Sequence, residues 1–395
     1  MKVIFFTLGY RNKLYGDLMD EFTKNSHEII VVTPDHRIHN TILEENCGQK
    51  ILRFRSLPLL NVDIVRKGIA NLLLPILTIR AVKKYLHNYQ PDLILMSTPP
   101  LAFFNAVRYI KKRIPNAIFY LILRDIHPEG AKFIGLDKYK PLYNYLRKIE
   151  KSLYTLSDFI GCMSPGNISF IAERNPSIIS KLHLLPNWIS IENFKNCNNE
   201  SIKIKYGFPG KFIAVYGGNM GIPQGLEIVL RLAESKQIYD DVIFLFIGSG
   251  TEKNRLQELS FSMRLNNVIF MESIPQHDYN ELMKACDIGL ISLHPKVPIP
   301  NIPSKTLSYF SMKLPVLASI DAITDYGIFI LDNSQGGLWS LATNFNQYSE
   351  NFDKLYYNPD LRKKMGENGY NYTKKYFSTT VAFNEIVSSY ESTKI

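Results

Sequence analysis

Short apolar runs alternate with amphipathic segments along the first half of the chain. Helical segments such as LYGDLMDEFTKN and AFFNAVRYIKKRI lie between four runs that are apolar almost throughout: KVIFFTL, EIIVVTP, DLILMST and AIFYLILRD. Strands that alternate with helices indicate βαβ units and a parallel sheet. Strands of such uniform apolarity are expected where helices cover both faces of the sheet. The pattern therefore predicts an α/β domain.

The second half of the 395-residue chain repeats this pattern. The runs FIAVYGG, DVIFLFIGSG, NVIFME, DIGLISL and PVLAS are typical of strands, and amphipathic segments such as QGLEIVLRLAESK separate them. We predict two Rossmann-like α/β domains that face a cleft, residues 1–186 and 203–380, joined by the polar segment 187–202. A ligand is expected in the cleft, at the carboxyl ends of the strands.

Composition indicates a cytoplasmic protein. The four cysteines are widely spaced and form no CxxC pair, which argues against a disulfide framework and a structural zinc site and fits a reducing compartment. The N-terminal run MKVIFFTLGY is not followed by a small-residue cleavage site, so it reads as a first strand and not as a signal peptide. The longest apolar stretch, residues 71–79, is too short to span a bilayer.

The positive charge is concentrated in the first half. Residues 1–190 carry an excess of 11 positive charges, whereas the remainder carries an excess of one negative charge. This split fits either a well-solvated basic domain or attraction to an anionic surface, phospholipid or nucleic acid.

The segment 66–86 adds an apolar body flanked by basic residues. Pro75 is expected to divide it into a helix pair, which could dip into the headgroups of an anionic membrane. The segment thus predicts peripheral attachment to the inner face of the cytoplasmic membrane. The alternative is an ordinary helix that covers the sheet.

Two glycine-rich turns follow predicted strands. GGNMGIPQG contains Gly218 and Asn219, and IGSGTEKN contains Gly248 and Gly250. Glycine permits positive φ and close approach of the backbone to an anion, and a following helix would point its positive end at a phosphate. Neither turn is a Walker A loop, because no GK[ST] follows. Each turn alone is equally consistent with a tight structural turn.

A third candidate site is the segment IPNIPSKTLSYFSM. Ser304 is a good N-cap residue, and Lys305 would lie in the first turn of a short helix. A lysine there opposes the helix dipole, which makes sense if an anion binds at that end. The alternative is a solvated lysine that tolerates a cost of a few tenths of a kcal/mol.

A fourth candidate is the segment LRDIHPEGA at the end of a predicted strand. Four ionisable residues, Arg124, Asp125, His127 and Glu129, lie within six positions, where strand ends line the cleft. The alternative is a polar loop with an N-capping aspartate. The chain has no DxD bracket, HExxH or GxSxG motif, so metal-dependent transfer and serine hydrolysis lack support from motifs.

In this order the segments resemble the family 4 glycosyltransferases, which have the GT-B architecture. The resemblance is diffuse over residues 1–190 and sharper over about 156–380. It rests on the collinear segments SDFIGCMSPGNISFI, LLPNWISIENF, YGGNMGIPQGLEIVL, FLFIGSGTEKNRL, NVIFMESIPQHDYNELMKACDIGLISL and PSKTLSYFSMKLPVLAS. GNMGxxQG together with PSK and the RDxxPE-like loop looks most like the bacterial transferases of N-acetylated deoxyhexosamines such as N-acetyl-L-fucosamine. Those enzymes build O-antigen and capsule on a lipid carrier.

The resemblance implies a retaining transfer that requires no metal or other cofactor. The C-terminal domain would hold a UDP-linked sugar, and the N-terminal domain would hold a lipid-linked glycan acceptor, with residues 381–395 packing back on it. No nucleic acid partner is implied. The implied catalytic residues are Asp125, His127, Glu129 and Lys305. The implied donor-binding residues are Gly9, Gly218, Asn219, Gly248, Gly250, Ile274, Ser304, Lys305 and Ser308.

The sequence departs from the family at several of these positions. Pro300 and Ser308 stand where the family has a pair of carboxylates, and Lys313 stands where it has a glycine. Asn219 and Gln224 replace a usual arginine and lysine, so neutralisation of the donor phosphates is expected to rest on Lys305. Two other functions fit the same architecture: a UDP-sugar 2-epimerase and a non-catalytic two-domain protein that binds sugar nucleotides.

Overall fold

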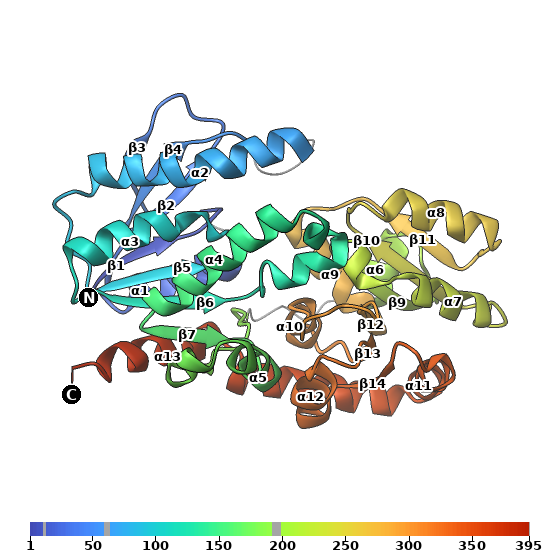
Figure 1. The fold of residues 1–395 in the computed structure, drawn as a ribbon. Helices are drawn as coiled ribbons and strands as arrows, with labels where there is room; N and C mark the ends of the chain where they lie inside the picture. Colours follow the sequence, from blue (N-terminus) through green and yellow to red (C-terminus); the bar gives the residue numbers. More distant parts are fainter. Residues whose placement is uncertain (11–12, 59–63, 192–198, 395) are drawn as a thin grey trace. The chain divides into compact units, whose positions relative to one another are not determined.

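The computed structural model describes residues 1–10, 13–58, 64–191 and 199–394 (Figure 1). The chain divides into unit 1, Met1–Trp188 with Thr379–Ile395, and unit 2, Ile189–Ser378. Each unit contains one largely parallel sheet with Rossmann-like strand order, so the predicted α/β class with two such sheets is confirmed. Most of the segment between them, residues 192–198, lies outside the described residues.

The sheet of unit 1 has the order β3-β4-β2-β1-β5-β6-β7-β8. Every pairing is parallel except the β3–β4 hairpin, whose turn residues Cys47 and Gly48 have the positive φ that a two-residue hairpin needs. The strands are β1 (Lys2–Phe6), β2 (Glu28–Asp35), β3 (Ile42–Asn46), β4 (Gln49–Arg55), β5 (Leu93–Ser97), β6 (Ile118–Leu123), β7 (Phe159–Cys162) and β8 (Leu182–Leu184). The α-helices are α1 (Lys13–Lys24), α2 (Ile64–Tyr85), α3 (Phe104–Arg113), α4 (Lys140–Leu156), α5 (Pro165–Arg174) and α13 (Thr379–Glu391).

The sheet of unit 2 is parallel throughout, with the order β11-β10-β9-β12-β13-β14. Its strands are β9 (Phe212–Gly217), β10 (Val242–Ile247), β11 (Val268–Met271), β12 (Ile288–Ser292), β13 (Val316–Ile320) and β14 (Gly337–Leu341). Its α-helices are α6 (Asn199–Lys205), α7 (Glu227–Ser235), α8 (Lys253–Ser262), α9 (Gln276–Ala285), α10 (Lys305–Ser311), α11 (Phe345–Tyr357) and α12 (Pro359–Tyr376). The strand order reverses between β9 and β12, and open α/β sheets bind ligands at the carboxyl ends of strands at such a point.

Hydrophobic burial explains both units. All six residues of β10 are buried, as the uniformly apolar run in the sequence predicts. The C-terminal helix α13 belongs to unit 1, because Phe383 and Ile386 are buried in its core and the Phe383 ring lies 4.8 Å from Phe22 of α1. The two ends of the chain are therefore in one core.

The break predicted at Pro75 is wrong, because α2 runs as one helix from Ile64 to Tyr85. A proline within a helix costs about 3 kcal/mol. Here Leu74 and Thr78 on either side of it are buried, and α2 packs on α3 and β4. This burial offsets the lost hydrogen bond, which the local sequence pattern could not show.

The residue after α10 is held in a left-handed conformation. Lys313 has φ of 58°. The family 4 glycosyltransferases, which the sequence resembles, have glycine at this position. We expect Lys313→Gly to raise the free energy of unfolding by about 1 kcal/mol, because a non-glycine residue in this conformation costs about that much. The exposed ion pair between the Lys313 amine and the Glu367 carboxylate, which are 2.7 Å apart, contributes less than this to the free energy of unfolding. Urea unfolding of Lys313→Gly beside Lys313→Ala measures the difference, and equal stabilities of these two variants would contradict the prediction.

Candidate functional site

The strand-order reversal of unit 2 brings Lys305 to the first glycine-rich turn. The Lys305 amine lies 3.6 Å from the centroid of the Tyr216 ring, at the end of β9. A Cβ atom placed on Gly218 would lie 4.0 Å from the same amine. Two predicted donor-binding residues that are 87 positions apart in the sequence are thus neighbours.

Lys305 carries a charge that the protein does not balance. Lys305 is half-buried, and in the described part of the chain its amine forms no ion pair and no hydrogen bond, whereas it lies over the Tyr216 ring. Burial lowers the pKa of this amine to about 7. A desolvated cation without a counter-charge is unfavourable, so the arrangement suits an anionic ligand that would supply the missing charge.

The two glycine-rich turns are packed against each other. Gly248 and Gly250 have φ of 142° and 153°, and a Cβ on either would overlap a backbone carbonyl oxygen, that of Gly218 or of Met220. The Met220 amide donates to the Ser249 carbonyl at 2.8 Å. Glycine is therefore required here for backbone contact between the turns, which is the structural alternative that the sequence left open.

This packing changes which amides could bind a phosphate. The Gly218 amide, predicted to face the donor, instead donates to the Ile247 carbonyl at 2.8 Å. The Asn219 side chain is exposed, and no acceptor within the described residues takes its backbone amide. The Asn219 amide is therefore left for a ligand.

The N-terminus of α10 has fewer groups available to an anion than the sequence predicted. Ser304 is at the N-cap, but its backbone is helical and its side chain makes no capping bond. The amides of Thr306 and Leu307 donate to the carbonyls of Pro303 and Ser304. Anion binding at this end would therefore depend on the Lys305 side chain more than on the helix amides. Ser308 lies one turn further along and is half-buried.

The remaining donor-binding candidates are less informative. Ile274 is half-buried in the loop between β11 and α9. Gly9 belongs to unit 1, in the loop after β1, where a Cβ would meet no atom within 4 Å. The packing of Gly9 against the described residues therefore does not require glycine.

The loop after β6 in unit 1 contains the acid–base candidates. Asp125 is exposed. His127 is half-buried, its Nδ1 has no hydrogen-bond partner in the part of the chain that the structure describes, and burial lowers the pKa of the imidazole. Both remain free to act on a ligand.

Glu129 is already engaged within unit 1. Its carboxylate accepts from Lys132 and from the Tyr143 hydroxyl, each at 2.6 Å. Burial would raise the pKa of Glu129, but these two donors hold it below its usual value. Glu129 is therefore poorly placed to act as a base, in contrast to its predicted role.

Arg124 is a structural anchor that the sequence motif did not distinguish from its neighbours. Its guanidinium is buried, donates to the Asn187 side chain at 2.5 Å and lies 4.1 Å from the centroid of Trp188. The Trp188 indole in turn donates to the Leu14 carbonyl at 2.7 Å. Arg124 thus fixes the last residues of unit 1 before the chain enters unit 2.

Comparison with known proteins identifies the reaction class. Residues 198–372 match the family model "Glycosyl transferases group 1". An uncharacterized glycosyltransferase of Methanocaldococcus jannaschii, MJ1069, is 23% identical, and the alignment covers 99% of this chain and 98% of that protein. The putative colanic acid biosynthesis glycosyl transferase WcaI of Escherichia coli K12 is 24% identical over 60% of each chain.

The protein is a glycosyltransferase.

Solved structures show the same fold. Sucrose-phosphate synthase from Thermosynechococcus elongatus superposes on the transferase with a TM-score of 0.79 at 16% identity, covering 99% of this chain and 98% of that one. Anabaena HepE in complex with UDP and glucose superposes with a TM-score of 0.72 at 13% identity, covering 99% and 100%. The fold of the transferase is GT-B.

The described residues contain neither a metal-binding cluster nor a membrane-spanning helix. No cluster of three or more His, Cys, Asp or Glu side chains that could hold a metal ion occurs among them. No helix there combines the length and the apolarity that crossing a bilayer requires.

Proposed function

We propose that the transferase moves a sugar from a UDP-linked donor, held by unit 2, to a lipid-linked glycan, held by unit 1, with retention of configuration. The observation that carries this proposal is the unbalanced charge of Lys305 beside the Gly218 turn, at the point where the strand order of unit 2 reverses. HepE, of the same fold, binds UDP, and the name of WcaI refers to polysaccharide synthesis. The sequence resemblance favours an N-acetylated deoxyhexosamine such as N-acetyl-L-fucosamine, in O-antigen or capsule synthesis.

The reaction asks little covalent chemistry of the protein, because a sugar diphosphate already has a good leaving group. The protein must stabilise the negative charge that develops on the leaving phosphate and orient the acceptor hydroxyl. Lys305 and the Asn219 amide supply the first function. Asp125 or His127 supplies the second, since Glu129 is bound to Lys132 and Tyr143. No residue in this scheme requires a metal.

A transfer assay tests this function. The purified enzyme is incubated with a panel of nucleotide sugars, with and without a lipid-linked glycan, and the anomeric configuration of the product is determined by NMR. Acceptor-dependent loss of a UDP-sugar with retention supports the proposal. Conversion of the donor without any acceptor, or an inverted product, contradicts it.

We predict that UDP binds more tightly than GDP or ADP. The support is the resemblance to enzymes that use UDP-sugars, together with the UDP complex of HepE. Isothermal titration calorimetry of the three nucleotides measures the preference. The prediction is wrong if GDP binds at least tenfold more tightly than UDP, a difference of about 1.4 kcal/mol.

We predict that α2 attaches unit 1 to anionic membranes. Ile69, Leu72, Leu73 and Ile76, spaced as one face of a helix, are between 38% and 68% exposed. Arg80, Lys83 and Lys84 continue the helix and are exposed, whereas the Lys67 side chain lies outside the described residues. Apolar side chains would enter the headgroup region while the basic ones bind anionic lipid, each adding about 1 kcal/mol.

Vesicle flotation with phosphatidylglycerol measures this attachment. Leu72→Asn/Ile76→Asn should lower the bound fraction several-fold, because the apolar face of α2 is removed. The matched control is Ile238→Asn/Ile328→Asn, which changes two exposed isoleucines of unit 2 and should leave binding unchanged. The prediction is wrong if the protein does not bind the vesicles at low salt, or if the bound fraction does not change with the salt concentration.

A further inference from the structure

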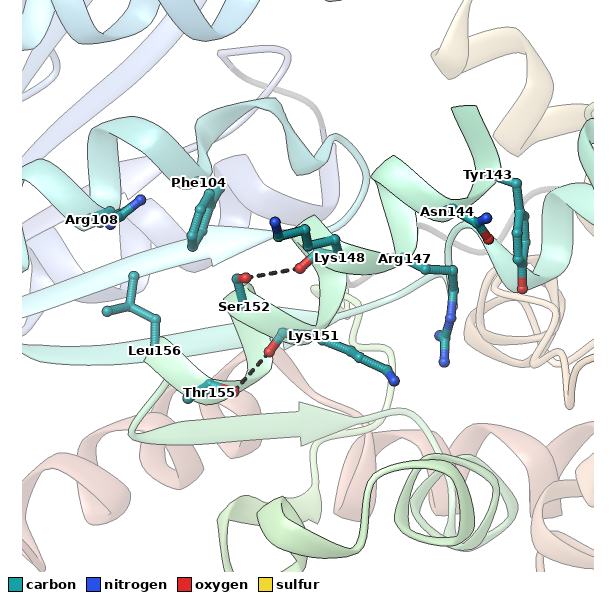
Figure 2. Close-up of a pocket in the computed structure, with 10 residues that line it drawn as sticks. All are labelled: Phe104, Arg108, Tyr143, Asn144, Arg147, Lys148, Lys151, Ser152, Thr155 and Leu156. Atoms are coloured by element: carbon teal, nitrogen blue, oxygen red, sulfur yellow. Dashed lines mark hydrogen bonds between the residues drawn. The ribbon is translucent and has the colours of Figure 1, made fainter. Parts of the chain in front are cut away.

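A basic groove runs along α4 in unit 1, outside the groups assigned above. It is open, has a volume of about 950 Å³ and is lined by α4 and by the first turns of the neighbouring α3. Figure 2 shows its side chains succeeding one another along α4, with Phe104 and Arg108 on α3. Arg108, Arg147, Lys148 and Lys151 supply four cationic groups, and none of the described residues that line the groove is acidic.

Most of this charge is unbalanced. Arg108, Lys148 and Lys151 are exposed, and none of them forms an ion pair with another described residue. Arg147 alone is paired, with the buried Glu150 behind it. Like charges at this density repel one another, so an anionic ligand would relieve a repulsion that the protein itself leaves in place.

The shape of the groove favours a long ligand. Its lining extends from Tyr143 to Leu156, which corresponds to about 20 Å of helix at 1.5 Å per residue. Polar side chains flank the cations of α4, with Asn144 before Arg147 and with Ser152 and Thr155 after Lys151. The Ser152 and Thr155 hydroxyls keep lone pairs for a donor because they donate to helix carbonyls. The lining of α4 therefore offers a group of cations with hydrogen-bonding side chains on either side of it.

We propose that this groove binds an acidic polysaccharide, a chain of sugars that carries carboxylate or phosphate groups. A recessed groove suits a linear chain better than a flat bilayer, which contacts protruding side chains. Single-stranded nucleic acid would require aromatic faces for stacking. Among the described lining residues only Phe104 and Tyr143 are aromatic, and they stand on different helices. The Tyr143 hydroxyl is bound to Glu129, and the Lys132 amine lies 5.1 Å from the Tyr143 ring centroid.

This proposal rests on the proposed function in one respect, which is that the ligand is a glycan. The acidic part of the acceptor or of the product would supply that glycan. Binding is measured without donor and without transfer. The groove can therefore fail this test while the transferase function stands, and the transfer assay can fail while the groove binds.

The test uses the full chain and polygalacturonate as the anionic probe, with dextran as a neutral one, in isothermal titration calorimetry at low and moderate salt. Wild type should bind polygalacturonate, more weakly as salt rises, and should ignore dextran. Arg108→Glu/Lys148→Glu/Lys151→Glu should weaken binding at least tenfold, about 1.4 kcal/mol. The matched control, Lys112→Glu/Lys363→Glu/Lys374→Glu, reverses three exposed lysines outside the groove and should change binding by less than about twofold.

Several outcomes would overturn the proposal. One is an equal loss of polygalacturonate affinity in the two triple variants. Another is that wild type binds dextran as tightly as polygalacturonate. The third is that the groove variant keeps the wild-type affinity while its circular dichroism spectrum is normal. The groove variant could also lose binding to phosphatidylglycerol vesicles or to oligothymidylate while keeping polygalacturonate. In that case the groove would serve a membrane or a nucleic acid instead.

Discussion

Lys305→Ala should lower kcat by about 100-fold or more, and should weaken donor binding much less. The Lys305 amine lies near the Gly218 turn and over the Tyr216 ring, and it forms no ion pair with the residues that the structure describes. Negative charge on the leaving phosphate grows during transfer, so the contact strengthens towards the transition state. The other candidate contacts at this turn, the Asn219 side chain and amide, carry no formal charge. An alternative cation for the phosphate would be Arg11 of unit 1, which lies outside the described residues.

Transfer kinetics of matched variants measure this effect. Lys313→Ala removes a lysine that is exposed and paired with Glu367, and should keep nearly wild-type kcat. Lys305→Arg should recover little, because a guanidinium fork does not place its donors where the amine was. Equal losses in Lys305→Ala and Lys313→Ala, with the fold intact by circular dichroism, would remove Lys305 from the mechanism.

The pH profile gives a second, independent readout. Burial lowers the pKa of Lys305 to about 7, so the free enzyme holds the ammonium form below this pH and loses it above. Because kcat/KM reports groups of the free enzyme, kcat/KM for the donor should fall as pH rises through about 7. Lys305→Ala should lack this limb of the profile. An unchanged limb in the variant would assign it to another group.

Gly248→Ala should lower the free energy of unfolding of unit 2 by about 3 kcal/mol, the combined cost of strain and overpacking. Gly248 has φ of 142°, and an added Cβ would overlap the Gly218 carbonyl. The turn that holds Gly218 and Asn219 would be displaced, so donor binding should be lost as well.

The control separates backbone strain from steric overlap. Gly207 has φ of 82°, but a Cβ there would meet no atom within 4 Å, so Gly207→Ala should cost only about 1 kcal/mol. Hydrogen exchange in β9 and β10 during urea unfolding is the suitable measurement, because a chain with two units need not unfold in one step. If Gly248→Ala and Gly207→Ala lower the free energy of unfolding equally, the close contact between the two glycine-rich turns does not contribute to stability.

The sequence was most informative where a physical rule is local. Apolar runs such as VIFLFI of β10 can be stable only when buried on both faces, so the strands and the α/β class followed from the pattern. Lys305 became a candidate because a lysine after Pro303-Ser304 opposes the helix dipole. The β3–β4 hairpin was missed, because ILEEN in β3 is polar and exposed and has no strand-like periodicity.

Residue partners could not be predicted in this way. The sequence placed Glu129 beside Asp125 and His127 as an equal candidate, but Tyr143, 14 residues later, engages its carboxylate. The sequence also marked the Gly218 amide as a phosphate ligand. In the structure this amide donates a hydrogen bond to the Ile247 carbonyl of β10. Hydrogen bonds between distant segments depend on strand order and register, which no local pattern encodes.

The sequence by itself determined the apolar strands and the α/β class, the glycine positions and the basic character of the first half, since these depend on periodicity, backbone freedom and composition. Only the tertiary structure decided which of the predicted site residues meet. It brought Lys305 to Gly218 by placing β12 beside β9, kept α2 continuous through Pro75 by burying its neighbours, and aligned the cations of α3 and α4 along one groove. Each of these outcomes follows from packing between segments far apart in the chain, where the gain from burial exceeds local preference.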